Sequence, residues 1–340
     1  MPKQSIRPNR WSPPKAPARA KQQRSAATVT MSVFDLPGTG PEDIVVDARG
    51  QVYTGVADGR ILRISPDGAE VETIANTGGR PLGLRLNDDS LLVCDSHRGL
   101  LRLHLATGII DTLVDTIDGE PMMFCSNCAV ATDGTIYFTE SSRRVHVEEY
   151  IADVLEHSNT GRLSRLMTDG SVEVILDDLK FANGVVLSPD ESWVAVAETT
   201  GYRISRIWLT GERAGQREDL VANLPGFPDN MSRGSDGLLW VALATPRDPL
   251  LDWLLPRPPI LRRIVWALPD ALRPKPQKMV WVQAYDDSGR LVHDLQTPHD
   301  RFFMATGMQE VDGTVWVGCL PAPTIARIEL SSVRTPRPPG

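Results

Sequence analysis

Apolar and polar positions alternate in short runs along most of the chain, and the runs end at turn residues. Aspartate, often followed by glycine, precedes a β-branched or aromatic strand at residues 133–137, 236–240 and 312–316, and related turns occur at 50–53, 89–92 and 190–193. A period of two with Asp-Gly between apolar runs is typical of β-hairpins, because side chains alternate between the two faces of a strand. The pattern therefore predicts a protein of short antiparallel strands.

A second element repeats after these turns, namely a short strand that carries an arginine. Its copies begin at Gly59, Gly99, Gly161, Tyr202 and Thr324, and a degenerate copy falls at residues 278–282. Six units of roughly 40 to 50 residues, rich in strands, are typical of a propeller with four-stranded blades. A β-sandwich would not give six matched units, and a solenoid would leave exposed sheet edges that ring closure protects. We predict an all-β, six-bladed β-propeller.

The repeat also predicts the organisation of the chain. Residues 1–28 are expected to form a disordered basic arm, residues 29–332 the propeller, and residues 333–340 a tail. Two insertions, near 141–160 and 244–277, separate the second and third strands of units 3 and 5. The second insertion has apolar residues at helical spacing together with Trp253 and Trp266, which predicts a helical, apolar lid that selects a hydrophobic substrate. A membrane-surface helix, a homodimer contact and packing against the propeller rim are the alternatives.

Charge and cysteine usage exclude several classes of function. The chain has 36 Lys and Arg against 43 Asp and Glu, and residues 1–34 contain seven basic residues and no acidic one. The folded body is therefore acidic, which argues against a nucleic-acid partner for it. No apolar run is long enough for a transmembrane segment or a secretory signal. Four cysteines are too few for a disulfide scaffold, and the Cys125 to Cys128 spacing lacks the second ligand pair of a zinc site. A cytoplasmic location is expected.

Polar residues are expected to converge at one end of the propeller axis. The innermost strand of each blade begins ten or eleven positions before its hairpin aromatic residue, and that count reaches Glu42 or Asp43, Asn127, Asn183, Asp229 with Asn230, and Thr306. In unit 2 it reaches Leu82, so the ring of polar residues is incomplete. Carboxylates and amides aimed at one point are costly to bury unpaired, and they share hard oxygen donors. The pattern predicts one Ca²⁺ site, with other divalent cations as alternatives.

Several longer motifs carry a resemblance to a known family. They lie at residues 40–43, 134–142, 181–190, 197–203, 224–230 and 312–318. In these motifs the chain resembles the strictosidine-synthase-like branch of the calcium-dependent six-bladed propellers, a superfamily that includes gluconolactonases of the senescence-marker (SMP-30) type, paraoxonases and diisopropyl-fluorophosphatases. The resemblance extends over about residues 33–330 and implies the same propeller fold.

The resemblance also implies a set of site residues. The family's catalytic calcium ligands correspond to Glu42, Asn127, Asn183 and Asp229, with Asn230 as a fifth oxygen donor. Asp43 matches one ligand of the second, structural calcium of paraoxonases, but Cys128 stands where another ligand is an aspartate. Thr306 stands where the condensing plant enzymes have a glutamate, and a threonine cannot serve as that acid or base. The resemblance therefore favours hydrolysis over alkaloid condensation.

Two residues are candidates for the base that activates water. Asp229 has that role in the gluconolactonase and fluorophosphatase branches. His97 follows the second strand of unit 2, close to the position of the base histidine in paraoxonases, and a neutral imidazole suits proton abstraction. Glu140 and Glu198 follow the second strands of units 3 and 4 and are expected at the same mouth.

These observations predict a calcium-dependent lactonase or esterase that acts on a small molecule with apolar substituents. The metal would polarise the carbonyl group, and His97 or Asp229 would activate water. A metal-independent condensing or isomerising enzyme is the first alternative. A propeller that binds a ligand without catalysis is the second.

Overall fold

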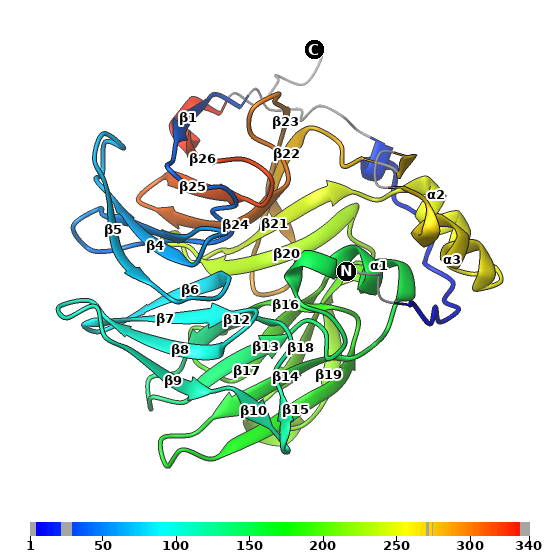
Figure 1. The fold of residues 1–340 in the computed structure, drawn as a ribbon, viewed down its shortest axis with the longest axis horizontal. Helices are drawn as coiled ribbons and strands as arrows, with labels where there is room; N and C mark the ends of the chain where they lie inside the picture. The colour runs from blue at the N-terminus through cyan, green and yellow to red at the C-terminus, as the bar shows by residue number, and fades with distance from the viewer. Residues whose placement is uncertain (1–4, 22–28, 270–271, 274, 334–340) are drawn as a thin grey trace.

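The chain folds into a six-bladed β-propeller (Figure 1). The computed structural model describes residues 5–21, 29–269, 272–273 and 275–333. Six sheets of four antiparallel strands surround an axis, and each innermost strand contacts the innermost strands of both neighbouring blades. The fold predicted from the repeat is therefore confirmed. No helix among the described residues is long and apolar enough to cross a membrane.

Each blade has an innermost, a second, a third and an outer strand. The innermost strands are β2 (Ile44–Val46), β6 (Pro81–Asn87), β12 (Cys125–Val130), β16 (Ala182–Leu187), β20 (Gly226–Arg233) and β24 (Ala305–Val311). The second strands are β3 (Val52–Gly55), β7 (Ser90–Asp95), β13 (Ile136–Glu140), β17 (Trp193–Glu198), β21 (Leu239–Pro246) and β25 (Thr314–Cys319). The third strands are β4 (Arg60–Ile64), β8 (Gly99–His104), β14 (Gly161–Leu166), β18 (Arg203–Trp208), β22 (Met279–Tyr285) and β26 (Thr324–Glu329).

The outer strands are β5 (Val71–Asn76), β9 (Ile110–Val114), β15 (Val172–Leu179), β19 (Arg217–Val221), β23 (Leu291–Pro298) and, in the sixth blade, β1 (Met31–Asp35). The sixth blade thus combines strands from both ends of the chain, because β1 pairs antiparallel with β26 from Met31 opposite Ile328 to Asp35 opposite Thr324. This pairing closes the ring by joining the first strand of the chain to the last blade. A small hairpin of β10 (Thr116–Ile117) and β11 (Glu120–Pro121) lies between blades 2 and 3.

The repeated arginine has a structural role in the outer half of the blades. In blade 1, Arg63 on the third strand lies opposite Tyr53 on the second and Glu72 on the fourth, with 2.6 Å between guanidinium and carboxylate. The arrangement recurs in blade 3, where Arg165 is 2.7 Å from Glu173. The arginine therefore joins the ring of the hairpin aromatic residue to an acid on the exposed outer strand, which explains why it recurs with the repeat.

Both predicted insertions contain helices, and these lie together on one side of the propeller (Figure 1). The first holds η2 (Val147–Glu149) and α1 (Tyr150–Glu156), and the second holds α2 (Pro249–Leu254) and α3 (Ile260–Ala267). The helix α2 begins with a proline and is capped by Asp248, whose carboxylate accepts hydrogen bonds from two backbone amides. The remaining one-turn elements are η1 (Ala18–Lys21), η3 (Thr199–Gly201), η4 (Gly211–Arg213) and η6 (Leu330–Ser332).

The N-terminal arm differs from the expectation of disorder over residues 1–28. Residues 5–21 pack across the helices of the two insertions: the amide of Asn9 donates to the carbonyl of Glu156 at 2.8 Å, and Ile6 is buried. Trp11 stacks on His157 with 4.5 Å between ring centroids. The basic, proline-rich composition suggested a solvated chain, but the few apolar residues are placed to contact the lid. Residues 1–4 and 22–28, like residues 334–340 of the predicted tail, lie outside the described part of the chain.

His157 gives this contact a pH dependence. The ring is buried, it has no hydrogen-bond partner among the described residues, and Lys180 and Arg262 add positive charge, so the pKa falls from 6.5 to about 3 despite the opposing charge of Glu198. The folded protein therefore binds this proton less readily than the unfolded chain, and stability falls as the pH drops below 6.5. We expect His157 to reduce the free energy of unfolding by about 2 kcal/mol between pH 7 and pH 5.

Urea unfolding at both pH values measures this effect in the wild type and in His157→Phe. The phenylalanine keeps a ring against Trp11 but cannot bind the proton, so its loss of stability between pH 7 and pH 5 should be smaller by the same amount. An equal loss in both proteins would contradict the assignment.

Candidate functional site

Polar side chains meet at one end of the axis because the same irregularity interrupts five innermost strands. The pairing with the second strand shifts register at two residues in each of β6, β12, β16, β20 and β24, and in blade 1 the equivalent two residues precede β2. A bulge of this kind departs from strict alternation of side chains, so two consecutive residues can be directed toward the axis. The six pairs are Glu42-Asp43, Leu82-Gly83, Ser126-Asn127, Asn183-Gly184, Asp229-Asn230 and Thr306-Gly307.

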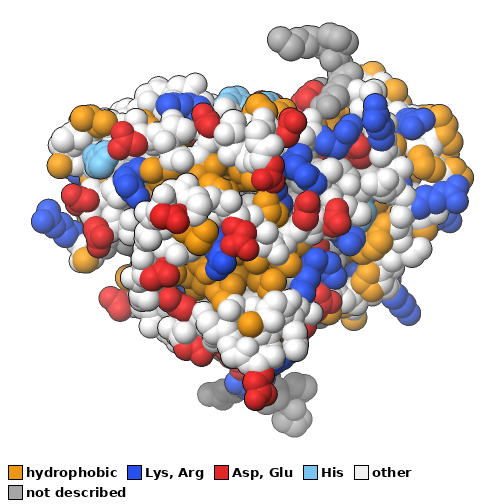
Figure 2. All heavy atoms as spheres, turned by 90° about the horizontal axis from the view of Figure 1, so that it is seen from below, with side chains coloured by type: hydrophobic (Ala, Val, Ile, Leu, Met, Phe, Trp, Pro, Cys, Tyr) orange, Lys and Arg blue, Asp and Glu red, His pale blue; other side chains and the backbone are white. Residues whose placement is uncertain are grey.

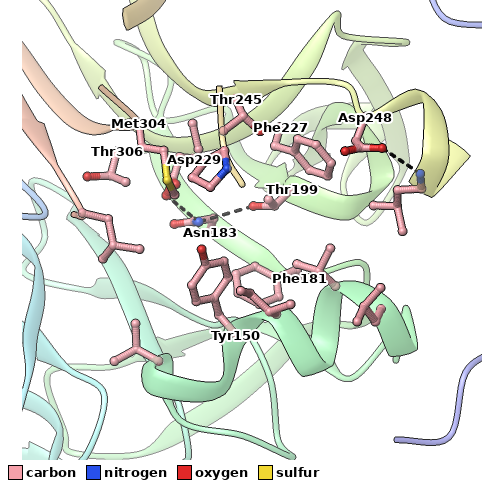
Figure 3. A pocket seen from close by; sticks show the side chains of 18 of the residues that line it. Tyr150, Phe181, Asn183, Thr199, Phe227, Asp229, Thr245, Asp248, Met304 and Thr306 are labelled. Carbon is pink, nitrogen blue, oxygen red and sulfur yellow. Dashed lines mark hydrogen bonds between the residues drawn. The ribbon is translucent and has the colours of Figure 1, made fainter. Parts of the chain in front are cut away.

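The first residue of each pair forms an upper layer that lines a cavity. All six members face the same pocket, namely Glu42, Leu82, Ser126, Asn183, Asp229 and Thr306. The amide of Asn183 donates to Asp229 Oδ1 at 2.6 Å, and its oxygen accepts from Ser126 Oγ at 3.1 Å. Figure 3 shows Asn183 between Asp229 and Thr199 on the floor of the pocket. Leu82 confirms that the polar ring is incomplete in blade 2.

The second residue of each pair forms a lower layer in which side chains alternate with glycine around the ring. Asp43, Asn127 and Asn230 come from blades 1, 3 and 5, whereas blades 2, 4 and 6 supply Gly83, Gly184 and Gly307. A Cβ atom on any of these glycines would lie within 2.4 Å of a neighbouring blade's atoms. The axis therefore has room for three side chains at this level, which is why the other three residues are glycine.

Hydrogen bonds join the two layers into one network. Asn127 Nδ2 donates to Asn230 Oδ1 at 3.0 Å, and Asn230 Nδ2 donates to Glu42 Oε1 at 2.9 Å. Asp43 accepts from the backbone amides of Ile44 and Leu84, both at 2.9 Å. The structure thus brings together all five residues predicted as calcium ligands, with Glu42, Asn183 and Asp229 above and Asn127 and Asn230 below.

The three carboxyl groups of this network are buried close together. Burial raises the pKa of Asp229 to about 8, with a contribution from the charge of Asp43, and burial raises the pKa of Asp43 itself to about 7. Burial and the charges of Asp229 and Asp43 raise the pKa of Glu42 well above its usual value, although Arg80 opposes this shift. Without a compensating cation, this site retains protons at neutral pH.

The donor set fits a hard divalent cation. Glu42 Oε2 is buried and has no hydrogen-bond partner among the described residues, although it belongs to a carboxylate on the pocket floor. Glu42 and Asp229 would supply two negative charges, and Asn127, Asn183 and Asn230 would supply neutral amide oxygens, a combination that suits calcium. In the described residues no three His, Cys, Asp or Glu side chains are grouped as a metal site, so a cation here depends on the amides.

A second cation in the lower layer has less support. Both oxygens of Asp43 accept hydrogen bonds from backbone amides, and Cys128, which stands where an aspartate ligand was expected, is a buried thiol without a disulfide. The other three cysteines, Cys94, Cys125 and Cys319, are also free and buried.

Apolar side chains form the walls of the pocket, which has a volume of about 230 Å³. Four of them precede an upper-layer residue by two positions, namely Phe124, Phe181, Phe227 and Met304. A spacing of two places both side chains on the same face of the chain, so this repeated pattern in the sequence indicates the apolar wall. The lid helices supply the roof, including Tyr150, Leu251 and Val265.

Tyr150 is a site residue that sequence reasoning missed. It begins α1, and its hydroxyl is directed toward Asn183 from the opposite wall of the pocket (Figure 3). The hydroxyl has no hydrogen-bond partner among the described residues. Burial, and then the charge of Asp229, raise the pKa of Tyr150, so the phenol is a neutral proton donor near pH 7.

The structure places His97 outside the pocket. Its side chain is 41% exposed, and Nε2 lies 3.0 Å from Glu148 Oε2. Its ring meets that of His146 edge to face, and His146 Nδ1 lies 2.8 Å from the carbonyl oxygen of Ser96. These contacts fasten the first insertion to blade 2. In the described part of the chain, the His97 side chain does not contact Asp229 or Asn183. Its role as a base stays a prediction.

Glu140 and Glu198 are also directed away from the pocket. Glu140 accepts from the backbone amide of Met123 at 2.7 Å and pairs with Arg162 at 2.6 Å. Glu198 accepts from the backbone amide of Lys180 at 3.1 Å and pairs with Arg203 at 2.7 Å. Each carboxylate therefore holds the loop that leads into the innermost strand of its own blade. Both residues position the site, and neither lines it.

The two tryptophans of the second insertion lie on opposite sides of the lid. Trp266 on α3 is buried in a cluster with Leu155, Tyr202 and Phe227. Trp253 on α2 is 49% exposed and stacks under Arg257, whose guanidinium carbon is 3.7 Å from the ring centroid. Neither lines the pocket. Thr306 does, and its hydroxyl donates to the carbonyl of Glu42 at 2.6 Å.

Comparison with known proteins identifies the family of the chain. Residues 127–212 match the strictosidine synthase family, and residues 30–64 match the N-terminal region of strictosidine-synthase-like proteins. The chain is 34% identical over 327 residues to the adipocyte plasma membrane-associated protein of Mus musculus, which covers 88% of this chain and 78% of the relative. It is 32% identical over 333 residues to the protein strictosidine synthase-like 10 of Arabidopsis thaliana, covering 88% and 87%.

A solved structure agrees with the fold. The gluconolactonase of Xanthomonas campestris superposes with a TM-score of 0.64 over 96% of this chain and 97% of its own, at 18% identity. The two sequence relatives each match 88% of this chain. The chain therefore belongs to the strictosidine-synthase-like family.

Proposed function

We propose that the protein is a calcium-dependent hydrolase of a lactone or ester with apolar substituents. One observation carries the proposal: a buried carboxylate oxygen without a partner, on Glu42, faces an apolar pocket beside Asp229 and Asn183. Such a carboxylate is costly to bury unless a cation or a proton compensates its charge. The fold shared with a gluconolactonase supports the same class of reaction, as an analogy of fold.

A bound calcium ion would supply a Lewis acid that stabilises the negative charge developing on the carbonyl oxygen. The chain's own residues supply the rest. Phe124, Phe181 and Phe227 hold the apolar part of the substrate and limit the access of water. Asp229 is the proton acceptor best placed for an attacking water, because its carboxylate faces the pocket and Asn183 fixes its orientation at 2.6 Å.

Tyr150 completes this arrangement from above. Its neutral hydroxyl faces the same floor and can donate a hydrogen bond to an oxygen of the substrate or of the leaving group. The residue lies on the first insertion, so the lid contributes chemistry as well as an apolar surface.

One observation favours the metal-independent condensing or isomerising enzyme. The amide nitrogens of Asn127, Asn183 and Asn230 already satisfy acceptors in the network, so the two layers are connected without an ion. Thr306 lies on the pocket floor at the position of the glutamate of condensing relatives and supplies no ionisable group. Condensation by that route is therefore disfavoured, but another metal-free reaction is consistent with the network.

Turnover across lactones of varied ring size and aryl esters, with and without chelator, separates the three possibilities. Activity that is lost in chelator and restored by Ca²⁺ is the expected result. Full activity in chelator would favour the metal-free enzyme. No turnover of any substrate by the calcium-loaded protein would favour a binding propeller.

Glu42→Gln tests the cation without using activity. In chelator the carboxyl groups of the folded wild type release their protons only as the pH rises through their raised pKa values, whereas the same groups in the unfolded chain release them near pH 4. The stability of the wild type therefore falls between about pH 4 and pH 8. Removing one carboxyl group should raise the Tm in chelator at pH 8 by about 2 °C or more. The same variant should lose most of the Tm increase that Ca²⁺ gives the wild type, since it lacks one ligand charge. A Ca²⁺ response equal to that of the wild type would exclude Glu42 as a ligand.

Asp229→Asn and His97→Gln distinguish the two candidate bases. Asparagine can still offer an oxygen but cannot accept the proton, so we expect kcat to fall by about 10²-fold or more. His97→Gln should change kcat less than about threefold, because the ring lies outside the pocket. The opposite ranking would restore His97 as the base. The melting curve of each variant in Ca²⁺ controls for loss of fold.

Tyr150→Phe removes one oxygen and preserves the ring. If the hydroxyl stabilises the transition state, kcat should fall about tenfold or more with little change in KM. Phe124→Leu is the matched control, since it alters the apolar wall and should act mainly on KM. A Tyr150→Phe variant with unchanged kcat would limit this residue to shaping the pocket.

A further inference from the structure

The helix α3 exposes two isoleucines and buries an arginine beside Trp266, which is unusual for a helix on the surface of a protein in water. Its inward side presents Arg262, which is fully buried, and its outward side presents Ile260 and Ile264, each 54% exposed. Val265 lines the pocket, whereas its neighbour Ile264 does not. A helix that is apolar on its outer side calls for an apolar surrounding there.

Arg262 fixes this orientation. Its guanidinium donates to the carbonyl of Leu155 at 2.9 Å, near the end of α1, and also to Leu255 just after α2 at 3.4 Å and to Asn9 of the arm at 2.5 Å. It therefore binds the carbonyl-rich ends of two helices, where a positive charge is favourable. Because this one side chain joins α1, α2, α3 and the arm, rotation of α3 to bury its isoleucines would break all these contacts.

Exposed hydrophobic side chains are concentrated on the same surface. Among the described residues, eight large hydrophobic side chains are exposed, and six belong to the lid: Ile151, Leu250, Trp253, Ile260, Ile264 and Leu272. We call these six residues the lid patch. Ile151 and Leu250 also line the pocket, so the lid patch continues into its mouth. A patch of this kind marks an interaction surface.

The charges around the lid patch are mainly positive. Arg263 and Lys275 are exposed on the second insertion, Arg257 covers Trp253, and Arg7 and Arg10 of the arm are exposed next to Asn9. Blue and orange side chains are interspersed on the right-hand side of Figure 2, the side on which α2 and α3 lie.

Most of the acidic groups described in the lid have local partners, with the half-buried Glu149 as the exception. Asp252 pairs with Arg247 at 2.9 Å, Glu156 with Arg144 at 2.9 Å, and Glu148 lies 3.0 Å from His97. Asp248 caps α2. The charge that the lid presents outward is therefore basic, although the body of the protein is acidic.

We propose that the lid patch docks on the surface of an anionic phospholipid bilayer, with the pocket mouth at the interface. Apolar side chains at the level of the acyl chains, surrounded by Arg and Lys at the level of the headgroups, are the features of an interfacial membrane site. A second copy of the chain is a less suitable occupant, because a two-fold contact would place these basic residues against their own copies. An apolar substrate that partitions into the bilayer would then reach the pocket directly.

Flotation of the full chain with vesicles tests the proposal without any substrate, so its outcome is independent of the proposed hydrolase activity. The wild type should float with vesicles of phosphatidylcholine mixed with phosphatidylglycerol, and binding should weaken with salt and on phosphatidylcholine alone. Ile260→Ser with Ile264→Ser should reduce binding at least about tenfold. Arg263→Glu should weaken binding to the anionic vesicles and leave binding to neutral vesicles unchanged.

Ile109→Ser is the matched control, since Ile109 is 58% exposed but lies beyond the lid, next to β9. It should float like the wild type, and all variants should melt like the wild type because the changed side chains are exposed. The proposal is overturned if the wild type does not float with anionic vesicles, or if the double isoleucine variant floats equally well. A wild-type dimer that this variant converts to a monomer, without vesicle binding, would assign the lid patch to a second copy instead.

Discussion

The narrowness of the propeller axis is the constraint on which the site depends. At the lower level only three of six blades contribute a side chain, because a Cβ on Gly83, Gly184 or Gly307 would collide with atoms of the next blade. The three side chains that remain, Asp43, Asn127 and Asn230, are polar and form hydrogen bonds with one another or with nearby backbone and Glu42. They form a platform beneath the upper layer, and the upper layer meets the pocket.

The two layers therefore have different tasks. The lower layer is enclosed, so each of its polar atoms needs a partner within the protein or an ion. The upper layer opens onto an apolar space, where no guanidinium of the described residues contacts Glu42 or Asp229. The positive charge of Arg80 opposes the raised pKa of Glu42, yet Arg80 donates its hydrogen bonds to the carbonyls of Gly40 and Pro81. Charge compensation at this level must come from a proton or from a bound cation, and each choice gives the site different chemistry.

Sequence patterns predicted the parts of this arrangement that repeat. The hairpin turns and the arginine strands recur in every unit or nearly so, and counting back from them located Glu42, Asn183 and Asp229 correctly. The layering was not predictable in this way, because the count reached two consecutive residues only in units 1 and 5, whereas two consecutive residues are directed inward in every blade. The glycines of the lower layer were visible in the sequence, but their alternation has meaning only once the blades are placed around a ring.

The parts that were missed depend on contacts between distant segments. Trp11 and Asn9 in a basic, proline-rich arm gave no local signal of order, and their partners are His157 and Glu156, far along the chain. The orientation of α3 could not be read from its periodicity, because two apolar stripes compete and a buried arginine decides between them. His97, by contrast, had a reasonable position in the repeat, but the loop that follows β7 turns its side chain toward Glu148 on the first insertion.

Membership of the family does not by itself determine the reaction, because the lower layer determines how the blades pack around the axis and the upper layer determines which groups meet the substrate. The alternation of glycine with polar residues in the lower layer follows from packing around the axis, so any chemistry can be built above it.

The reaction depends on the six upper positions, which here present two carboxylates, one amide, two hydroxyls and one leucine to the substrate. A propeller with a carboxylate in place of Thr306 would have an ionisable group in the blade between those of Asp229 and Glu42, and a different set of proton transfers. The insertions act in the same way, since Tyr150 reaches the floor only because α1 crosses the mouth of the ring. Fold therefore fixes where chemistry can occur in this protein, and a few side chains above the platform decide which chemistry it is.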